Sequence, residues 1–155
     1  MVLAPVPNVA TGDFAAVMAK ASVVYKDIDS SYAKQCLEAA KKAWTYLESS
    51  QVGVGYRNPD DILTGEYPDA RDPDERYWAA IELYKATGDE KYKTYYTGIM
   101  DSYVMHGYGW AQVSSYGNMS YLNSDIKESK YENLIKNSIN LALIFSYLCF
   151  FISKQ

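Results

Sequence analysis

Five carboxylates lie within the ten-residue acidic stretch that runs from Glu66 to Glu75. The stretch reads EYPDARDPDE, and its acidic members are Glu66, Asp69, Asp72, Asp74 and Glu75. Carboxylates gathered in this way can bind a hard cation such as Ca²⁺, or can act as general acid and general base. They also suit the start of a helix, where the helix dipole stabilises each by about 0.3–1 kcal/mol. We interpret them chiefly as helix-start residues, because Pro73 fits the first turn of a helix that begins there.

Two predicted helices follow the acidic stretch and are joined by a very short turn. Tyr77 and Trp78 open the first helix, and both Trp44 and Trp78 are expected to pack in the core. Gly88 suits the left-handed position after a helix end, and Asp89 suits the cap of the next helix. The second helix keeps helical spacing at Tyr92, Tyr95, Tyr96, Ile99 and Tyr103. Residues 74–103 are therefore predicted to form an antiparallel helix pair.

Two further helices are predicted before the acidic stretch. The first starts near 11–13, where Thr11 or Asp13 can cap it, and the second runs from the turn at 27–31 to about Ser50. The first carries an apolar stripe of Phe14, Val17, Met18, Ala21 and Val24, and the second a stripe of Ala33, Leu37, Ala40, Trp44 and Leu47. Both stripes are expected to face the core.

Two long loops separate these elements. Residues 51–64 are rich in Gly and Asn-Pro turn signals, and residues 104–118 are rich in Gly and aromatic residues. In the second loop Tyr108, Trp110 and Tyr116 are expected to be exposed, before a short helix or turn at 119–123. Long loops on a helical scaffold tend to carry function.

Composition excludes several classes of protein. The 155 residues suffice for one domain with a core, and a dispersed net charge of −4 provides no basic surface for nucleic acid. The single histidine, His106, removes most schemes that need a histidine nucleophile or a histidine metal site. Cys36 and Cys149 have no metal-ligand spacing and are expected to be free buried thiols. Most of the 16 tyrosines are expected to be packing residues, and the first residues do not resemble a signal peptide.

The C-terminal segment differs in composition from the rest of the chain. No charged residue occurs between Lys136 and Lys154, and residues 141–152 are nearly all apolar. The run is shorter than the roughly 20 residues that span a bilayer as a helix. It can be a buried helix, a weak membrane anchor or sequence from a non-native reading frame, and we favour the third. The predicted division is therefore 1–136 for the folded domain and 137–155 for an apolar tail.

The acidic stretch and its helices resemble glycoside hydrolase family 9, the (α/α)6-barrel cellulases. The resemblance rests on TGEY at 64–67 and on DPDERYWAAIELYKATGDEKY at 72–92. Three more segments are similar to that family in the same order: DFAAVMAKA at 13–21, CLEAAKKAW at 36–44, and GWAQV at 109–113 with Gly117 and SYL at 120–122. The resemblance covers about residues 5 to 123. It implies an all-α fold, a partial (α/α)6 barrel built of antiparallel helix pairs.

The resemblance also implies hydrolysis of β-1,4-glucosidic bonds in cellulose-like glucans with inversion. Inversion requires two carboxyl groups roughly 6.5–9.5 Å apart. The family's base lies in an Asp-Ala-Gly-Asp motif and its acid is a later glutamate, and this chain contains neither. The Thr-Gly-Asp triplets at 11–13 and 87–89 suit helix caps instead. The chain is therefore expected to be an internal fragment that is inactive without the remainder of the catalytic domain, in an enzyme that is secreted and not membrane-bound.

Two kinds of site carry over from the resemblance. Some members bind calcium with an Asp-Glu pair at this helix start, which Asp74 and Glu75 match, and with a later aspartate. At that later position Ala111 and Gln112 follow Trp110 without a carboxylate, so any calcium role is weakened, and no cofactor is required. Sugar rings are expected to stack on Tyr67, Tyr108 and Trp110, although each can equally pack under its own loop.

The asparagine of Asn118-Met119-Ser120 fits the acceptor pattern for N-glycosylation. Two other functions remain open. Paired helices also build non-catalytic helical-repeat binding modules, although no period of 34 to 45 residues recurs here. Another (α/α)6 carbohydrate-active enzyme, such as a polysaccharide lyase, would share the fold without the acidic stretch in this setting.

Overall fold

The computed structural model describes residues 6–63, 65, 68–104 and 108–152, with residues 143–152 described by their backbone. These residues form six α-helices and one 3₁₀ turn. In chain order they are α1 Asn8–Val24, α2 Ser30–Ser49, α3 Pro73–Thr87, α4 Glu90–Ile99, η1 Met100–Ser102, α5 Ser114–Leu122 and α6 Ser129–Ile152. Isolated bridges, with no extended strand, are the only β-structure in the described ranges. The all-α prediction is confirmed.

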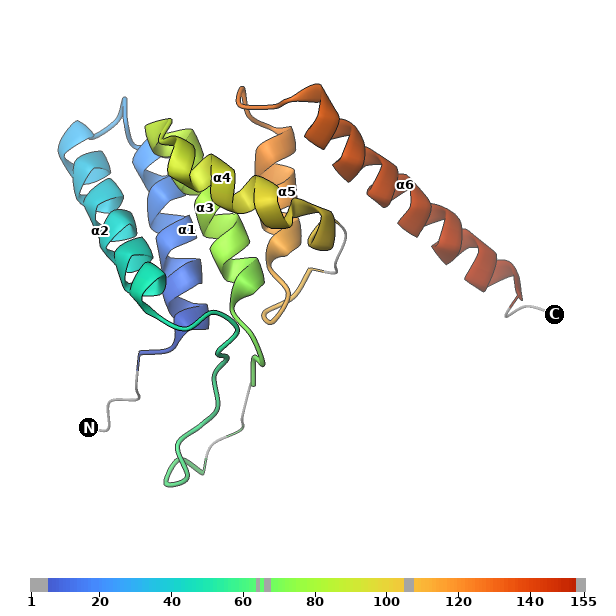
Figure 1. The fold of residues 1–155 in the computed structure, drawn as a ribbon, viewed down its shortest axis with the longest axis horizontal. Helices are drawn as coiled ribbons and strands as arrows, with labels where there is room; N and C mark the ends of the chain where they lie inside the picture. The colour runs from blue at the N-terminus through green and yellow to red at the C-terminus, as the bar shows by residue number, and fades with distance from the viewer. Residues whose placement is uncertain (1–5, 64, 66–67, 105–107, 153–155) are drawn as a thin grey trace.

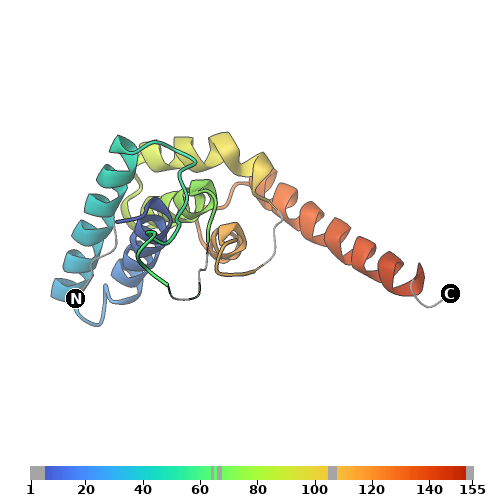
Figure 2. The same ribbon diagram turned by 90° about the horizontal axis from the view of Figure 1, so that it is seen from below.

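The helices form two layers. Helices α1, α3 and α5 lie side by side and start at the same end of the molecule (Figure 1). Helices α2, α4 and α6 form an arc outside them, which is clearest when the row of inner helices is seen from below (Figure 2). Each inner helix contacts the outer helix that follows it in the chain. Both long loops join the inner row at the end where its helices start (Figure 1).

Small residues on α1 allow its close packing against α2 and α3. Ala15, Ala16 and Ala19 are fully buried, and a Cβ added at Gly12 would lie 2.4 Å from Cβ of Glu75. The predicted core stripe on this helix is therefore wrong. Its large members Phe14, Val17 and Val24 are 49%, 51% and 58% exposed, because the small face of α1, not the large one, makes the contacts. The helix also begins at Asn8, before the expected caps at 11–13.

The predictions for α2 and for the turn between α3 and α4 are confirmed. Asp29 caps α2 by accepting a hydrogen bond from the Tyr32 amide at 2.9 Å. Gly88 has φ 69° at the end of α3, and the Asp89 side chain accepts from the Lys91 amide at 3.0 Å. On α2 the buried residues are Ala33, Cys36, Ala40, Trp44 and Leu47, with Leu37 half-buried. The expected burial of Cys36 is thus correct, whereas the side chain of Cys149 lies outside the described part.

Aromatic packing joins α4 to its outer neighbour α2 and also to the inner row, where the Tyr96 ring meets Tyr84 of α3 and Tyr121 of α5. The Trp44 ring meets Tyr92 and Tyr95 of α4 edge-on, with ring centroids 5.4 and 5.1 Å apart. Tyr77, Tyr96 and Tyr121 are fully buried, as expected for packing residues. These contacts hold α4 across the inner row.

The C-terminal part of the chain differs from its prediction in one respect. Helix α5 begins at Ser114, so the second loop ends at 113 and Tyr116 lies on a helix instead of in the loop. Helix α6 includes the apolar run up to Ile152 and extends away from the body (Figure 1). Within the residues that the structure describes, no helix combines the length and the apolar character that a membrane span needs.

Candidate functional site

A buried ion pair fixes the first long loop to the start of α3. The Arg76 guanidinium donates to the Asp72 carboxylate at 2.7 Å and to the Leu47 carbonyl at 2.7 Å. The other Asp72 oxygen accepts from the amide of Gly53 at 2.5 Å. Asp72 and Arg76 are 0% and 2% exposed, so the pair is shielded from water. Asp72 therefore joins the end of α2, the loop and α3, rather than capping α3 with its side chain.

The first loop folds back on itself at a second point. The amide of Tyr56 donates to the carbonyl of Asp69 at 2.6 Å, which forms an isolated antiparallel bridge. A Cβ at Gly55 would lie 1.9 Å from that same carbonyl oxygen, so only glycine allows this approach. The two ends of the loop are thus held together beside the acidic stretch.

Asp74 connects the second loop to the same helix start. Its carboxylate accepts from the backbone amide of Val113 at 2.9 Å. A short bridge between Gly109 and Gln112 places Trp110 at the tip of this loop. Trp110 and Tyr108 are each 58% exposed, as predicted for stacking residues. Tyr67, the third predicted stacking residue, lies outside the described residues, as does His106.

A cavity of about 380 Å³ lies between the acidic stretch and the second long loop. The residues that line it are Pro68, Asp69, Ala70, Arg71, Pro73, Asp74, Tyr103, Ala111 and Gln112. Ala111, which lines the cavity, directly follows Trp110 in the chain. The lining combines two carboxylates, of Asp69 and Asp74, with the guanidinium of Arg71 and the ring of Tyr103. Such a polar cavity with neighbouring exposed aromatics suits a hydroxylated ring, whose C–H faces stack while its hydroxyls hydrogen-bond.

Among the members of the acidic stretch that the structure describes, Glu75 alone is buried without a hydrogen-bond partner for its carboxyl oxygens. It is 0% exposed, and neither of its carboxyl oxygens has a hydrogen-bond partner. Burial, followed by the nearby charge of Asp74, raises the pKa of Glu75 to about 10. Burial and the charges of Asp69 and Asp74 also raise the pKa of Asp13 to about 6, and one Asp13 oxygen lacks a partner. The N-terminal ends of α1 and α3 thus hold carboxyl groups whose ionised forms need a cation.

The predicted calcium ligands lie in this cluster but do not form a complete cage. Glu75 offers two unpartnered oxygens, which is the donor chemistry that Ca²⁺ prefers. Within the described ranges, however, no three His, Cys, Asp or Glu side chains converge closely enough to hold a metal ion. The sequence predicts only a capping role for Asp13. Its position near Asp69 and Asp74 depends on how closely α1 approaches α3, which no local pattern in the sequence reports.

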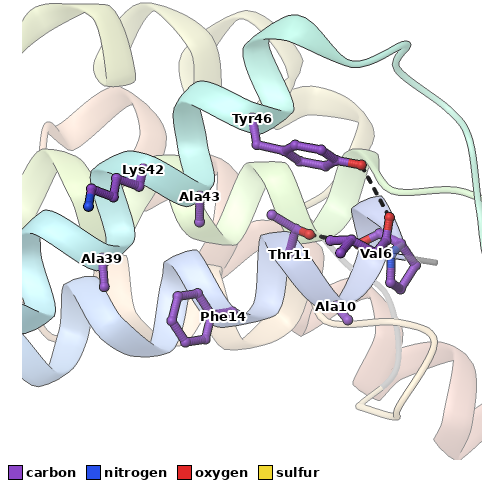
Figure 3. Close-up of a pocket in the computed structure, with 9 residues that line it drawn as sticks. Val6, Ala10, Thr11, Phe14, Ala39, Lys42, Ala43 and Tyr46 are labelled. Atoms are coloured by element: carbon purple, nitrogen blue, oxygen red, sulfur yellow. Dashed lines mark hydrogen bonds between the residues drawn. The ribbon is translucent and has the colours of Figure 1, made fainter. Parts of the chain in front are cut away.

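Another cavity, of about 520 Å³, lies in an apolar groove between α1 and α2. Phe14 and Tyr46 flank it, the Tyr46 hydroxyl donates to the carbonyl of Val6 at 3.1 Å, and Lys42 provides its only charge (Figure 3). Its lining includes no residue of either long loop and none of the carboxylates of the acidic stretch. We therefore assign the candidate site to the cavity between the acidic stretch and the second loop.

The N-glycosylation pattern does not correspond to an accessible asparagine. Asn118 is 3% exposed, its side-chain carbonyl accepts from the Tyr77 hydroxyl at 2.6 Å, and its amide donates to the Tyr103 carbonyl at 2.8 Å. Both polar atoms are therefore committed to holding α5 against α3 and η1.

An inner row of parallel helices, each followed by an outer helix, defines this chain as part of an (α/α)6 barrel, with its candidate site among the loops at one end. Comparison with known families identifies it further. The glycosyl hydrolase family 9 model matches residues 4–148, and the chain belongs to that family. The match extends beyond the residues 5 to 123 on which the sequence resemblance rests, and it includes most of α6.

Curated relatives are glucan-degrading enzymes. The chain is 32% identical to endoglucanase D of Acetivibrio thermocellus over 124 residues, which cover 78% of this chain and 20% of that protein. It is 35% identical to the cellodextrinase of Butyrivibrio fibrisolvens over 132 residues, covering 76% of this chain and 24% of that one. The chain thus spans about a fifth to a quarter of these relatives.

Solved structures have the same arrangement of helices. A single mutant of the thermostable endoglucanase from Alicyclobacillus acidocaldarius aligns with a TM-score of 0.76 and 35% identity, over 88% of this chain and 26% of that one. AaCel9A in complex with cellobiose-like isofagomine aligns with a TM-score of 0.74 and 34% identity over the same shares. The prediction of a partial (α/α)6 barrel is confirmed.

Proposed function

We propose that this chain is part of a secreted glycoside hydrolase that cleaves β-1,4-glucosidic bonds of cellulose-like glucans with inversion. The observation that carries the proposal is the cavity between the acidic stretch and the second loop, the loop that also carries the exposed rings of Trp110 and Tyr108. Family membership supports the class of reaction, and the isofagomine complex of a neighbouring structure supports a β-glucan ligand.

In this proposal the chain contributes substrate binding rather than bond cleavage. Trp110, Tyr108 and Tyr67 stack on glucose rings, while Asp74 holds the loop of Trp110 in place through the Val113 amide. Inverting hydrolysis requires a general base and a general acid, one on each side of the sugar ring. Neither the Asp-Ala-Gly-Asp base motif nor the later acid glutamate of the family occurs in the 155 residues. Cleavage therefore depends on residues of the catalytic domain that lie outside this sequence.

Titration with cellohexaose by calorimetry tests the binding role. We expect weak binding that Trp110→Ala reduces about two- to tenfold, since stacking on an aromatic ring contributes about 0.5–1.5 kcal/mol beyond the area that it buries. Tyr32→Ala is the matched control, because it removes an exposed aromatic from α2, far from both loops, and should leave the affinity unchanged. Equal losses in the two variants, or no binding by the parent chain, would contradict the assignment.

We further propose that Asp74 and Glu75 form a weak structural calcium site. The ion would neutralise the buried Glu75 carboxylate and would be completed by backbone and water oxygens, since Gln112 stands where the family's later carboxylate is expected. Calcium at millimolar concentration should then raise Tm, and Glu75→Gln should abolish the rise. Asp101→Asn removes an exposed carboxylate outside the acidic stretch and serves as control. An equal rise in Tm for parent and Glu75→Gln would contradict the site.

A helical-repeat binding module and another (α/α)6 carbohydrate-active enzyme were the two alternatives. No observation favours the former, because the inner and outer rows belong to a barrel whose family is established by residues 4–148. The family match likewise assigns the chain to family 9 among the (α/α)6 enzymes.

A further inference from the structure

Asn118 of α5 holds the backbone from which the second long loop starts. Its side-chain amide donates to the carbonyl of Tyr103 at 2.8 Å, and Tyr103 directly precedes the loop. Asn118 is 3% exposed, so little water competes for this hydrogen bond. The bond joins two residues that are 15 positions apart in the chain, and it ties the start of the loop to α5.

Tyr77 of α3 fixes the orientation of the Asn118 amide. Its hydroxyl donates to the side-chain carbonyl of Asn118 at 2.6 Å. Because one carbonyl cannot donate to another, only this orientation of the amide also satisfies the carbonyl of Tyr103. The ring of Tyr77 stacks on the ring of Tyr103, with centroids 5.8 Å apart and planes at 26°. Tyr103 is therefore held by its carbonyl and by its ring.

Tyr103 in turn belongs to the candidate site. It is half-buried and lines the cavity between the acidic stretch and the second loop. At the other end of the same loop, Asp74 accepts from a backbone amide at 2.9 Å. The exposed rings of Tyr108 and Trp110 thus lie on a segment that is tied to the helices at both ends.

The position of this loop determines how well its aromatic rings can bind. A loop that must be ordered when a ligand arrives lowers the affinity, because only the correctly placed fraction of the chain is competent to bind. We propose that Asn118 is a positioning residue of the β-glucan site, a role that rests on the function proposed above. It acts through Tyr103 and the loop of Trp110 and does not touch the substrate.

Asn118→Asp tests the amide donor with almost no change in shape. Near pH 8 the ionised carboxylate still accepts from Tyr77 but has no proton for the Tyr103 carbonyl, and the two oxygens repel. We expect the Trp110 indole resonance of the ¹⁵N-labelled chain to move, and the affinity for cellohexaose to fall about two- to tenfold, the range for one lost hydrogen bond. Near pH 5 the buried carboxyl is protonated, because burial raises its pKa, and it can donate again. The resonance and the affinity should then return toward the parental values.

The groups around Asn118 keep their charge in this pH window. Burial raises the pKa of Tyr77, and burial followed by the charge of Asp74 raises the pKa of Tyr103, so both hydroxyls stay protonated. A small cavity beside Asn118 is lined by uncharged residues: Val104, Tyr108, Ser115, Met119, Ile135 and Ile139. The parent, titrated in parallel, accounts for every titratable group that the two chains share.

Tyr77→Phe is the matched control, because it breaks the other hydrogen bond of Asn118 and keeps the ring that stacks on Tyr103. It should lower Tm, as Asn118→Asp does near pH 8, but leave the Trp110 resonance and the cellohexaose affinity at their parental values. Asn118→Ser has a side chain too short to keep both hydrogen bonds. It should change both readouts at either pH, and it replaces Asn118→Asp if that variant is unfolded near pH 8.

Equal movement of the Trp110 resonance in Tyr77→Phe and in Asn118→Asp, at the same loss of Tm, would reduce Asn118 to a stability role and overturn the proposal. A resonance that stays at its parental position near pH 8, or that does not recover near pH 5, would also overturn it. The resonance is measured without ligand, so the two proposals fail differently. A parent chain that binds no cellohexaose overturns the β-glucan site, whereas an unmoved resonance with parental affinity in the Asn118 variants overturns the positioning role alone.

Discussion

Two glutamates on α3 are equally buried but have opposite environments. Glu82 accepts from the Trp78 indole and from Lys85, with Lys20 nearby, whereas Glu75 has no hydrogen-bond partner for either oxygen. They lie two helical turns apart on the same helix, so neither helix type nor depth distinguishes them. The difference is the neighbouring charge: lysines face Glu82, and Asp74 with Asp69 faces Glu75. Burial thus produces a structural ion pair at one position and an uncharged acid at the other.

The largest effect is expected where a buried pair is broken beside Glu75. Arg76→Met leaves the Asp72 carboxylate buried with no cation, which costs about 3–5 kcal/mol of unfolding free energy. The variant sharpens the comparison, because Asp72 lies in the same region as Glu75 and differs from it in having a partner. Chemical denaturation measures the change. A loss below about 1 kcal/mol would contradict this prediction and would show that the Asp72–Arg76 pair contributes little to the free energy of unfolding.

A smaller loss is expected at the other glutamate. Glu82→Gln keeps the shape of the side chain but leaves Lys85, whose side chain is 17% exposed, without a counter-ion, for a cost of about 2 kcal/mol. Urea denaturation of Glu82→Gln beside Glu38→Gln controls for surface charge, because Glu38 forms an exposed pair with Lys41. Should the two variants lose the same stability, Glu82 would not be the ionised partner described above.

The smallest change in the free energy of unfolding is expected for Glu75→Gln at low pH. The measurement is made with a chelator, so that no divalent cation is present. Near pH 5 the folded state already holds Glu75 protonated, so the neutral amide changes the unfolding free energy by less than about 1 kcal/mol. Above the ordinary pKa of 4.5 the unfolded chain releases this proton, while the folded chain retains it up to about pH 10. Parental stability therefore falls over that window, by on the order of 1 kcal/mol per pH unit, and the variant is spared this loss.

Unfolding curves between pH 5 and 9 for the parent and for Glu75→Gln test this pH dependence. The stability advantage of Glu75→Gln over the parent should grow steadily with pH. A flat difference for Glu75→Gln would mean that Glu75 is ionised in the folded chain.

Local chemistry was sufficient to predict much of the fold. Asp29, Gly88 and Asp89 act at the helix boundaries because caps and left-handed turns depend on a few neighbouring residues. The prediction that Phe14 and Val17 face the core is wrong. Amphipathic spacing shows which residues share one face of a helix, but it does not show what that face packs against. On α1 the face that packs most closely is made of small residues, and the spacing of the large apolar residues does not reveal that face.

The candidate site was predicted less completely than the fold. The exposure of Tyr108 and Trp110 is confirmed, because glycine-rich aromatic loops have little local structure to bury them. The positions of Asp13 near Asp69 and Asp74, and of Lys20 near Glu82, depend on contacts between segments that are distant in sequence. The role of Arg76 as the partner of Asp72 follows helical spacing of four residues, and that signal was available in the sequence.

The most direct test of the functional account is product analysis after incubation of the purified chain with cellohexaose. The account predicts binding that depends on Trp110 and no shorter oligosaccharide, because we propose that the chain provides a wall of the cleft and that the base and acid lie outside this sequence. Release of cellobiose or cellotriose by the parent chain, absent from a heat-inactivated sample, would contradict it and would place a complete catalytic pair within these 155 residues.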